Sequence, residues 1–185
     1  MAVLHFQWSG NGIARMTMAL ERLESSRRHA AFRRALNHTG DKTFTQVKRT
    51  LSKQMGLTQK ALMGNGRNLK KRRAAGGALD YQIISHGGAI RLKEFKHRVT
   101  SKGLTAYPWG VRHSFKSAFV IPSYGGNLYR RRTAKRFPLE ALYGPNISKE
   151  LVKDATAAAF QAIVATELPP RVEHEVRVIT SGVLS

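Results

Sequence analysis

Apolar residues recur every three or four positions over two N-terminal segments, a spacing that predicts helices. The first segment runs from Ile13 to Leu36, and its apolar positions alternate with many arginines. We expect one long helix here, opened by Asn11-Gly12 and closed near Asn37–Gly40. The second segment has the apolar positions Phe44, Val47, Leu51 and Met55. It ends at Gly56, where glycine suits a helix C-cap, and Thr58 is placed to cap a further turn through Met63.

Between residues 78 and 132 the pattern changes to short runs rich in β-branched and aromatic residues. The runs are ALDYQIIS, AIRLKEF, LTAYPW, SAFVIP and LYRRR, and glycine-containing turns at 86–88, 101–103 and 124–127 separate several of them. Pro108 and Pro122 are expected at strand ends, because proline cannot donate to a β-ladder. These runs predict a central antiparallel β-sheet of four to five strands.

The remaining segments are predicted from turn residues and from a third helical pattern. Residues 64–77 (GNGRNLKKRRAAGG) indicate a basic, glycine-rich exposed loop, and residues 133–147 a basic, proline-containing connector. Residues 148–180 are typical of C-terminal helices, with Ser148 as N-cap and a break or kink at Pro169-Pro170. The chain of 185 residues is therefore expected to form a single α+β domain, with a helical N-terminal part at 12–63.

Charge is strongly asymmetric along the chain. Lys and Arg number 32 against 11 acids, a formal net charge of +21. Residues 1–136 hold 28 cations and 5 acids (net +23), whereas residues 137–185 hold 4 cations and 6 acids (net −2). Such a chain indicates a polyanionic neighbour at one end and contact with protein at the other. The alternative is a basic protein whose acidic helix is only solvated.

Motifs for catalysis are missing. The sequence has no Walker-type phosphate loop, no H-E-x-x-H and no G-x-S-x-G, and its seven His residues do not pair at metal-ligand spacing. There is no Cys, which fits a reducing compartment, and no apolar run of membrane-spanning length. We expect a soluble protein made in the cytoplasm, not an enzyme, with no catalytic residues, cofactor or metal and no membrane association.

Two basic clusters and one apolar segment are the candidate binding residues. The clusters can contact DNA phosphates or an acidic partner; they are Lys70, Lys71, Arg72 and Arg73, and Arg130, Arg131, Arg132, Lys135 and Arg136. The apolar segment can contact a neighbouring subunit; it comprises Phe137, Pro138, Leu139, Leu142, Tyr143, Gly144 and Pro145. The alternatives are solvated cations and an apolar segment that packs on its own core.

The order of these segments resembles the minor tail protein Z family of long-tailed phages and prophages. The resemblance covers roughly residues 14–179, and its most specific part is R-[FY]-P-[IL]-x-x-[LV]-x-G-P at Arg136–Pro145, preceded by an R-R run and an apolar "AF" strand. Arg130–Arg136 matches the cationic run of the family and Phe137–Pro145 its proline-bounded connector. The loop around Lys70–Arg73 does not align with the family pattern.

The resemblance implies a structural virion protein that completes the head-proximal end of a phage tail. Its expected partners are other tail and neck proteins (tail terminator, tail tube, connector), further copies of itself in a homo-oligomeric ring, and genomic DNA in the channel. Head-to-tail contacts close into a ring when the rotation between subunits permits it. The alternative function is a stand-alone, sequence-nonspecific nucleic-acid-binding protein.

Overall fold

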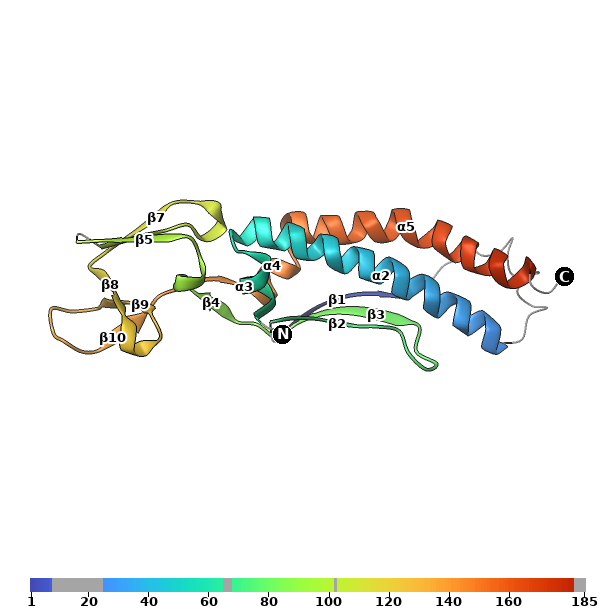
Figure 1. The fold of residues 1–185 in the computed structure, drawn as a ribbon, viewed down its shortest axis with the longest axis horizontal. Coiled ribbons are helices and arrows are strands. Elements are labelled where there is room, and N and C mark those ends of the chain that lie inside the picture. Colours follow the sequence, from blue (N-terminus) through green and yellow to red (C-terminus); the bar gives the residue numbers. More distant parts are fainter. Residues whose placement is uncertain (8–24, 65–67, 102, 182–185) are drawn as a thin grey trace.

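Two long antiparallel helices form the spine of the molecule (Figure 1). They are α2 (Ser25–Met55) and α5 (Asp154–Ser181). Arg34 of α2 bonds to Glu175 near the end of α5, and Gln54 bonds to Thr156 near its start, so the helices run in opposite directions. The structure is a computed structural model that describes residues 1–7, 25–64, 68–101 and 103–181. Residues 13–24 of the helix predicted over 13–36, its predicted opening at Asn11-Gly12 and the turn residue Lys102 lie outside the described residues.

A three-stranded antiparallel sheet packs beside this helix pair. Its order is β1 (Ala2–Gln7), β3 (Asp80–Ser85), β2 (Leu69–Arg72). Alternate residues of β3 (Tyr81, Ile83 and Ser85) are fully buried, as expected for a strand with one face against helices. The short helices α3 (Gln59–Met63) and α4 (Ile147–Leu151) lie at the end of this helical lobe where α2 ends.

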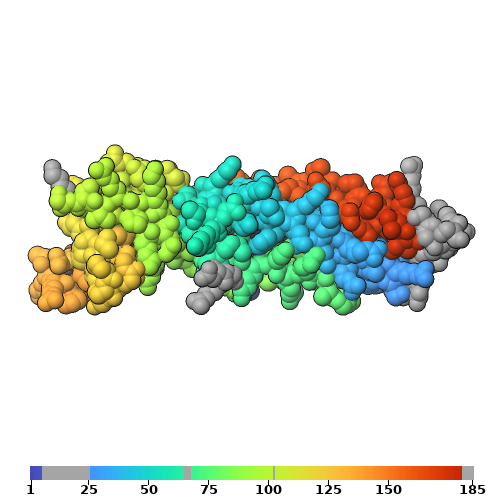
Figure 2. All heavy atoms as spheres, viewed as in Figure 1, coloured from blue at the N-terminus to red at the C-terminus, as the bar shows by residue number. Residues whose placement is uncertain are grey.

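Residues 89–146 form a second, β-rich lobe, which gives the molecule its elongated shape (Figure 2). Strand β4 (Ala89–Arg91) pairs with β11 (Tyr143–Asn146) where the two lobes meet. Two three-stranded antiparallel sheets lie beyond it. The first has β5 (His97–Thr100), β6 (Gly103–Ala106) and β7 (His113–Lys116), and the second has β8 (Ala118–Ile121), β9 (Asn127–Arg131) and β10 (Leu139–Ala141).

Several local predictions are confirmed. The fold is α+β, and α2 ends at Met55 with Gly56 in the left-handed region at φ 72°. Thr58 caps α3 by accepting a hydrogen bond from the Ala61 amide. Pro108 begins a short 3-10 turn one residue after the end of β6, and Pro122 begins one directly after β8 in the turn that joins β8 to β9.

The predicted helix end near Asn37–Gly40 is wrong, because α2 continues through it. Asn37 exchanges two hydrogen bonds with the backbone of Ala74, donating at 3.0 Å and accepting at 2.8 Å. A Cβ on Gly40 would lie 2.3 Å from the ring of Tyr81. These turn-type residues therefore hold the sheet close to α2 and do not end the helix.

The chain does not break at Pro169-Pro170, which was one of the two outcomes predicted there, and the predicted cap at Ser148 is wrong. Helix α5 runs through both prolines, which are exposed, while Leu168 and Val172 on either side are buried against the core. Packing of α5 on α2 outweighs the amide donors that proline lacks. Asn146 caps α4 by accepting from the Lys149 amide, whereas Ser148 donates to the Gly87 carbonyl.

The strands are more dispersed than one central sheet. Strand β1 was not predicted, β2 lies inside the predicted loop 64–77, and β10 and β11 lie inside the predicted connector 133–147. The strands form three three-stranded sheets and one two-stranded sheet in the described part of the chain. Within the same residues, no helix is both long and apolar enough to cross a membrane.

Candidate nucleic-acid and partner interface

The cluster Arg130–Arg136 lies at the tip of the β-lobe, on the hairpin between β9 and β10 (Figure 1). Every residue from Arg130 to Pro138 is exposed. The sequence forms a hairpin here because residues 139–141 extend along β9, with Glu140 opposite Arg130. We call residues 130–138 the tip. It is a cationic projection of the kind that can meet a polyanion without rearrangement.

The tip keeps most of its charge unpaired. Arg130 Nε donates to Glu140 Oε2 at 2.9 Å, and this hydrogen bond lowers the pKa of the Glu140 carboxyl. The Arg131 guanidinium lies 5.0 Å from the ring centroid of Phe119, and that of Arg136 lies 5.6 Å from the ring of Phe137. Arg132 and Lys135 have no ion pair among the described residues. Five cations thus face one carboxylate.

A hollow of about 540 Å³ lies at the base of the tip. It is lined by Lys116, Ser117, Arg130, Arg131, Arg132 and Glu140. Ser117 has φ 57°, and this left-handed residue turns the chain from β7 into β8 beside the arginines. The hollow is polar and open, so an oxyanion on a surface that approaches the tip could enter it.

The apolar segment Phe137–Pro145 divides between the surface and the core. Phe137 is 58% exposed at the tip, and Tyr143 is 50% exposed at the junction between the lobes. Leu142 is buried, and its backbone bonds to both Leu128 and Leu92. The segment thus packs on its own core only in part: Leu142 and Pro145 are buried, Leu139 and Gly144 are partly buried, and Phe137, Pro138 and Tyr143 are exposed. Contact with a neighbouring subunit stays a prediction for the three exposed residues.

Lys70–Arg73 is not in a free loop, and its cations are mostly paired. Strand β2 holds the first three residues, and Arg73 follows directly. Lys71 and Arg73 bond to the Asp41 carboxylate at 2.7 and 3.2 Å, and Arg72 lies 3.3 Å from Asp80. Lys70 is the one member without an ion pair among the described residues. This cluster mainly fastens β2 to α2.

Asp41 is the centre of that attachment. Burial alone would raise the pKa of Asp41, but hydrogen bonds from Lys71 and Tyr81 outweigh it, and the pKa lies below its ordinary value. Burial and the bond to Asp41 raise the pKa of Tyr81 well above its ordinary value. Asp41 therefore stays ionised and Tyr81 stays protonated at neutral pH, a stable donor and acceptor pair.

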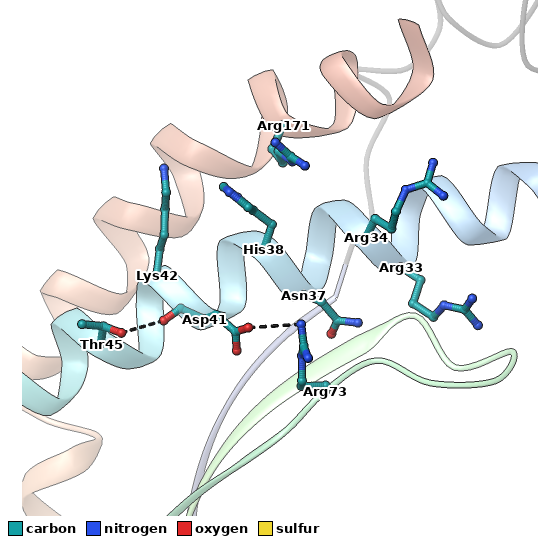
Figure 3. Close-up of a pocket in the computed structure, with 9 residues that line it drawn as sticks. All are labelled: Arg33, Arg34, Asn37, His38, Asp41, Lys42, Thr45, Arg73 and Arg171. Carbon is teal, nitrogen blue, oxygen red and sulfur yellow. Dashed lines mark hydrogen bonds and ion pairs between the residues drawn. The ribbon is translucent and has the colours of Figure 1, made fainter. Parts of the chain in front are cut away.

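The structure does not bring the two predicted clusters together. The tip is at the far end of the β-lobe, whereas β2 lies under α2 in the helical lobe (Figure 1). Instead, Arg73 joins a basic surface that the sequence prediction missed. It is a groove of about 600 Å³ (Figure 3), lined by Arg33, Arg34, Asn37, His38, Asp41, Lys42 and Thr45 of α2, by Arg73 and by Arg171 of α5. The signal in the sequence was the charge of α2, eight cations against one acid.

Ion pairs fix the side chains that line this groove. Arg34 Nε donates to Glu175 Oε2 at 2.6 Å, and Lys42 Nζ donates to Glu167 Oε2 at 2.7 Å, so both pairs join α2 to α5. Burial, Arg171 and Lys42 lower the pKa of His38, in that order of size. His38 is consequently neutral at pH 7, and the positive potential around it comes from the arginines and lysines.

No protein-family model, no curated protein and no solved structure matches this chain. Among the described residues, no three His, Asp or Glu side chains gather as metal ligands would.

Proposed function

We propose that this chain is a structural virion protein, a subunit of the ring that completes the head-proximal end of a phage tail. The observation that carries the proposal is the tip, where five cations and an exposed Phe137 follow one another on a projecting hairpin. A ring subunit needs cations where it approaches packaged DNA or an acidic partner, and exposed aromatic anchors where it meets a neighbour. The resemblance at Arg136–Pro145 supports the same role.

The elongated shape also supports an assembly role. The tip projects at one end of the long axis and the helix pair occupies the other (Figure 2). Copies arranged around an axis can then direct one lobe toward the channel and use the other for contacts with tail tube, terminator or connector. In the assembled virion the protein is placed at the head-proximal end of the tail.

The first experiment is deletion of the gene from its phage or prophage, followed by electron microscopy and infectivity assays of the particles. Faulty tails, poor head–tail joining or undelivered genomes are expected. Complete and infectious particles would contradict the proposal. They would favour the second candidate, a sequence-nonspecific nucleic-acid-binding protein, which the basic groove along α2 supports.

The second experiment tests the tip. Arg132→Glu with Lys135→Glu reverses two tip charges that make no ion pair in the described chain, so the fold should survive. We expect this variant to fail to restore infectivity to the deletion strain. The matched control is Arg98→Glu with Arg112→Glu, two exposed cations of the same lobe, which should restore it. Full infectivity of the folded tip variant would show that the tip has no role in assembly.

A further inference from the structure

Helix α2 carries far more positive charge than its own stability explains. Residues 25–55 contain eight Lys and Arg and one acid, whereas α5 contains two Lys and Arg and four acids. In α5 the cations pair with Glu at i,i+4, as in Glu173 with Arg177. In the described part of α2 no ion pair joins two of its own residues, because Asp41 bonds to Lys71 and Arg73. Arg49 and Lys53 are like charges four residues apart, a spacing that destabilises a helix, and no acid of α2 offsets this repulsion.

The exposed cations of α2 lie in one row. Arg27, Arg34, Lys42, Arg49 and Lys53 are separated by steps of four, seven or eight residues, which keep them on one face of a helix. At a rise of about 1.5 Å per residue the row is roughly 40 Å long. It is long enough to meet several phosphates, since duplex DNA carries about one charge per 1.7 Å of its axis.

The cations of this surface fall into two groups. In the first group, carboxylates hold the side chains in defined positions: Glu175 and Glu167 of α5 hold Arg34 and Lys42, and Asp41 holds Arg73. Six further cations of α2 have no ion pair in the described chain and supply unneutralised charge; they are Arg27, Arg28, Arg33, Lys48, Arg49 and Lys53. The side chains in ion pairs are already ordered, so they lose less conformational entropy when they bind a phosphate. The cations without an ion pair release more counterions from the DNA when they bind.

We infer that this face of α2, with Arg73 and Arg171 at its sides, binds the phosphate backbone of duplex DNA. The inference rests on the proposed function, which brings the subunit to the genome, and it assigns the DNA contact to the helical lobe. The tip is then free to meet an acidic protein partner. Backbone contacts of this kind are independent of sequence, and they remove the repulsion between the α2 cations.

The test compares three variants that each remove two positive charges. The α2 variant is Arg27→Gln with Arg49→Gln, the tip variant is Arg132→Gln with Lys135→Gln, and the control is Arg98→Gln with Arg112→Gln. All six side chains are exposed and have no ion pair in the described chain. Thermal unfolding followed by circular dichroism checks that each variant is folded.

Binding of the purified full chain to a 30-base-pair duplex of arbitrary sequence is measured over a series of salt concentrations. The α2 variant should bind about tenfold more weakly, and its log–log salt slope should fall by about two, one for each lost phosphate contact. The tip and control variants should each lose less than about threefold, as expected from net charge alone.

Equal losses in all three variants would overturn the inference, because they would show a general electrostatic effect. A larger loss in the tip variant would move the DNA contact to the tip, and wild-type binding by the α2 variant would exclude α2. The binding assay uses the purified chain, so its outcome does not depend on whether particles assemble. Faulty tails after gene deletion, with an α2 variant that binds like the wild type, would reject this inference alone and leave the proposed function intact.

Discussion

Gly40 sets the distance between α2 and the β1–β3–β2 sheet. A Cβ at this position would lie 2.3–2.4 Å from three atoms of the Tyr81 ring, which is fully buried. The ring cannot move away easily, because its hydroxyl donates to Asp41 at 2.9 Å. The glycine is thus required by packing and not by its backbone conformation.

Gly40→Ala should destabilise the protein although alanine is the better helix former. Alanine gains about 1 kcal/mol in helix propensity, but overpacking costs about 1–3 kcal/mol. We expect a net loss of unfolding free energy in urea denaturation. Gln46→Ala, on an exposed position of the same helix, is the control and should be neutral or slightly stabilising. A Gly40→Ala variant as stable as the wild type would show that α2 and the sheet can separate without cost.

Glu175 gives the helix pair a defined pH dependence. Its carboxylate is buried, and burial alone would raise its pKa, but Arg34 and Arg171 outweigh this and the pKa of Glu175 lies below its ordinary value. The ordinary pKa of a glutamate, which applies to the unfolded chain, is 4.5. The stabilisation is therefore complete above the unfolded pKa and is lost as the pH falls through the folded pKa.

Glu175→Gln should lower the unfolding free energy at pH 7 by more than about 1 kcal/mol, the scale of hydrogen bonds to charged groups. Between pH 7 and pH 3 the stability of this variant should fall less steeply than that of the wild type. Glu173→Gln, which removes an exposed carboxylate from the same helix, serves as the control. Parallel pH profiles for wild type and Glu175→Gln would contradict the assignment.

At the residue scale, local signals were predictable and long-range ones were not. The helix end at Gly56 and the N-cap at Thr58 can be predicted from neighbouring residues in the sequence, and the structure confirms both. Asn37 and Gly40 look equally like a helix end, but their partners, Ala74 and Tyr81, lie 37 and 41 residues away. No pattern within one helix reveals such contacts.

At the scale of elements, Gln54 joins three helices. Its amide nitrogen donates to the Glu150 carbonyl and to Glu150 Oε2 in α4. Its amide oxygen accepts from the backbone and the hydroxyl of Thr156, in the first turn of α5. A side chain of α2 thus satisfies an amide that would otherwise lack a partner at the start of α5.

Gln54→Met should remove the hydrogen bonds that link α2 to α4 and α5 without a large change in side-chain volume. Loss of the bonds to Glu150 and Thr156 leaves buried polar groups unsatisfied, so we expect a loss of about 1–3 kcal/mol in unfolding free energy. Amide hydrogen exchange should increase first at the start of α5. Gln46→Met on the exposed face is the control, and equal stability of the two variants would show that the Gln54 bonds contribute nothing.

Elements with an alternating or helical pattern were predictable, and elements without one were missed. Strand β3 alternates between buried and half-buried residues and was found as ALDYQIIS. In β2 only Leu69 is buried and three cations follow, so the strand resembles a loop. Strand β10 starts directly after Pro138 and β11 contains Pro145, so neither segment has the sequence pattern of a strand. Both are strands only because they pair with β9 and β4. For the candidate site, the tip was predicted by its cations, whereas the α2 groove depends on the approach of α5 and β2.

At the scale of the whole molecule, the β-lobe is one continuous stretch of chain. Residues 89–146 leave the helical lobe through β4 and return through β11, and these two strands pair with each other. At the base, the Ile147 amide donates to the Gly88 carbonyl at 3.2 Å. The helical lobe keeps its own buried residues on both sides of this stretch, among them Leu36, Leu51, Ile83, Leu151 and Val172.

Replacement of residues 89–146 by a short Gly-Ser linker should therefore leave a folded helical lobe. We expect a helical circular dichroism spectrum and a cooperative thermal transition, with lower stability because the turn Pro108–Gly110 no longer covers Gly56. Duplex binding should persist in this shortened chain if α2 carries it. A shortened chain without a cooperative transition would show that the two lobes fold only as one unit.

The adjacency of Gly88 and Ile147 has a consequence for how such proteins diversify. An insertion whose ends already touch can be lengthened, shortened or exchanged without moving the frame that holds it. Selection can thus alter the reach and the charge of the projecting lobe to suit a new neighbour while the helical lobe stays as it is. We expect the sequences of relatives of this chain to vary most between these two residues, in the β-lobe, and least in the helical lobe that carries it.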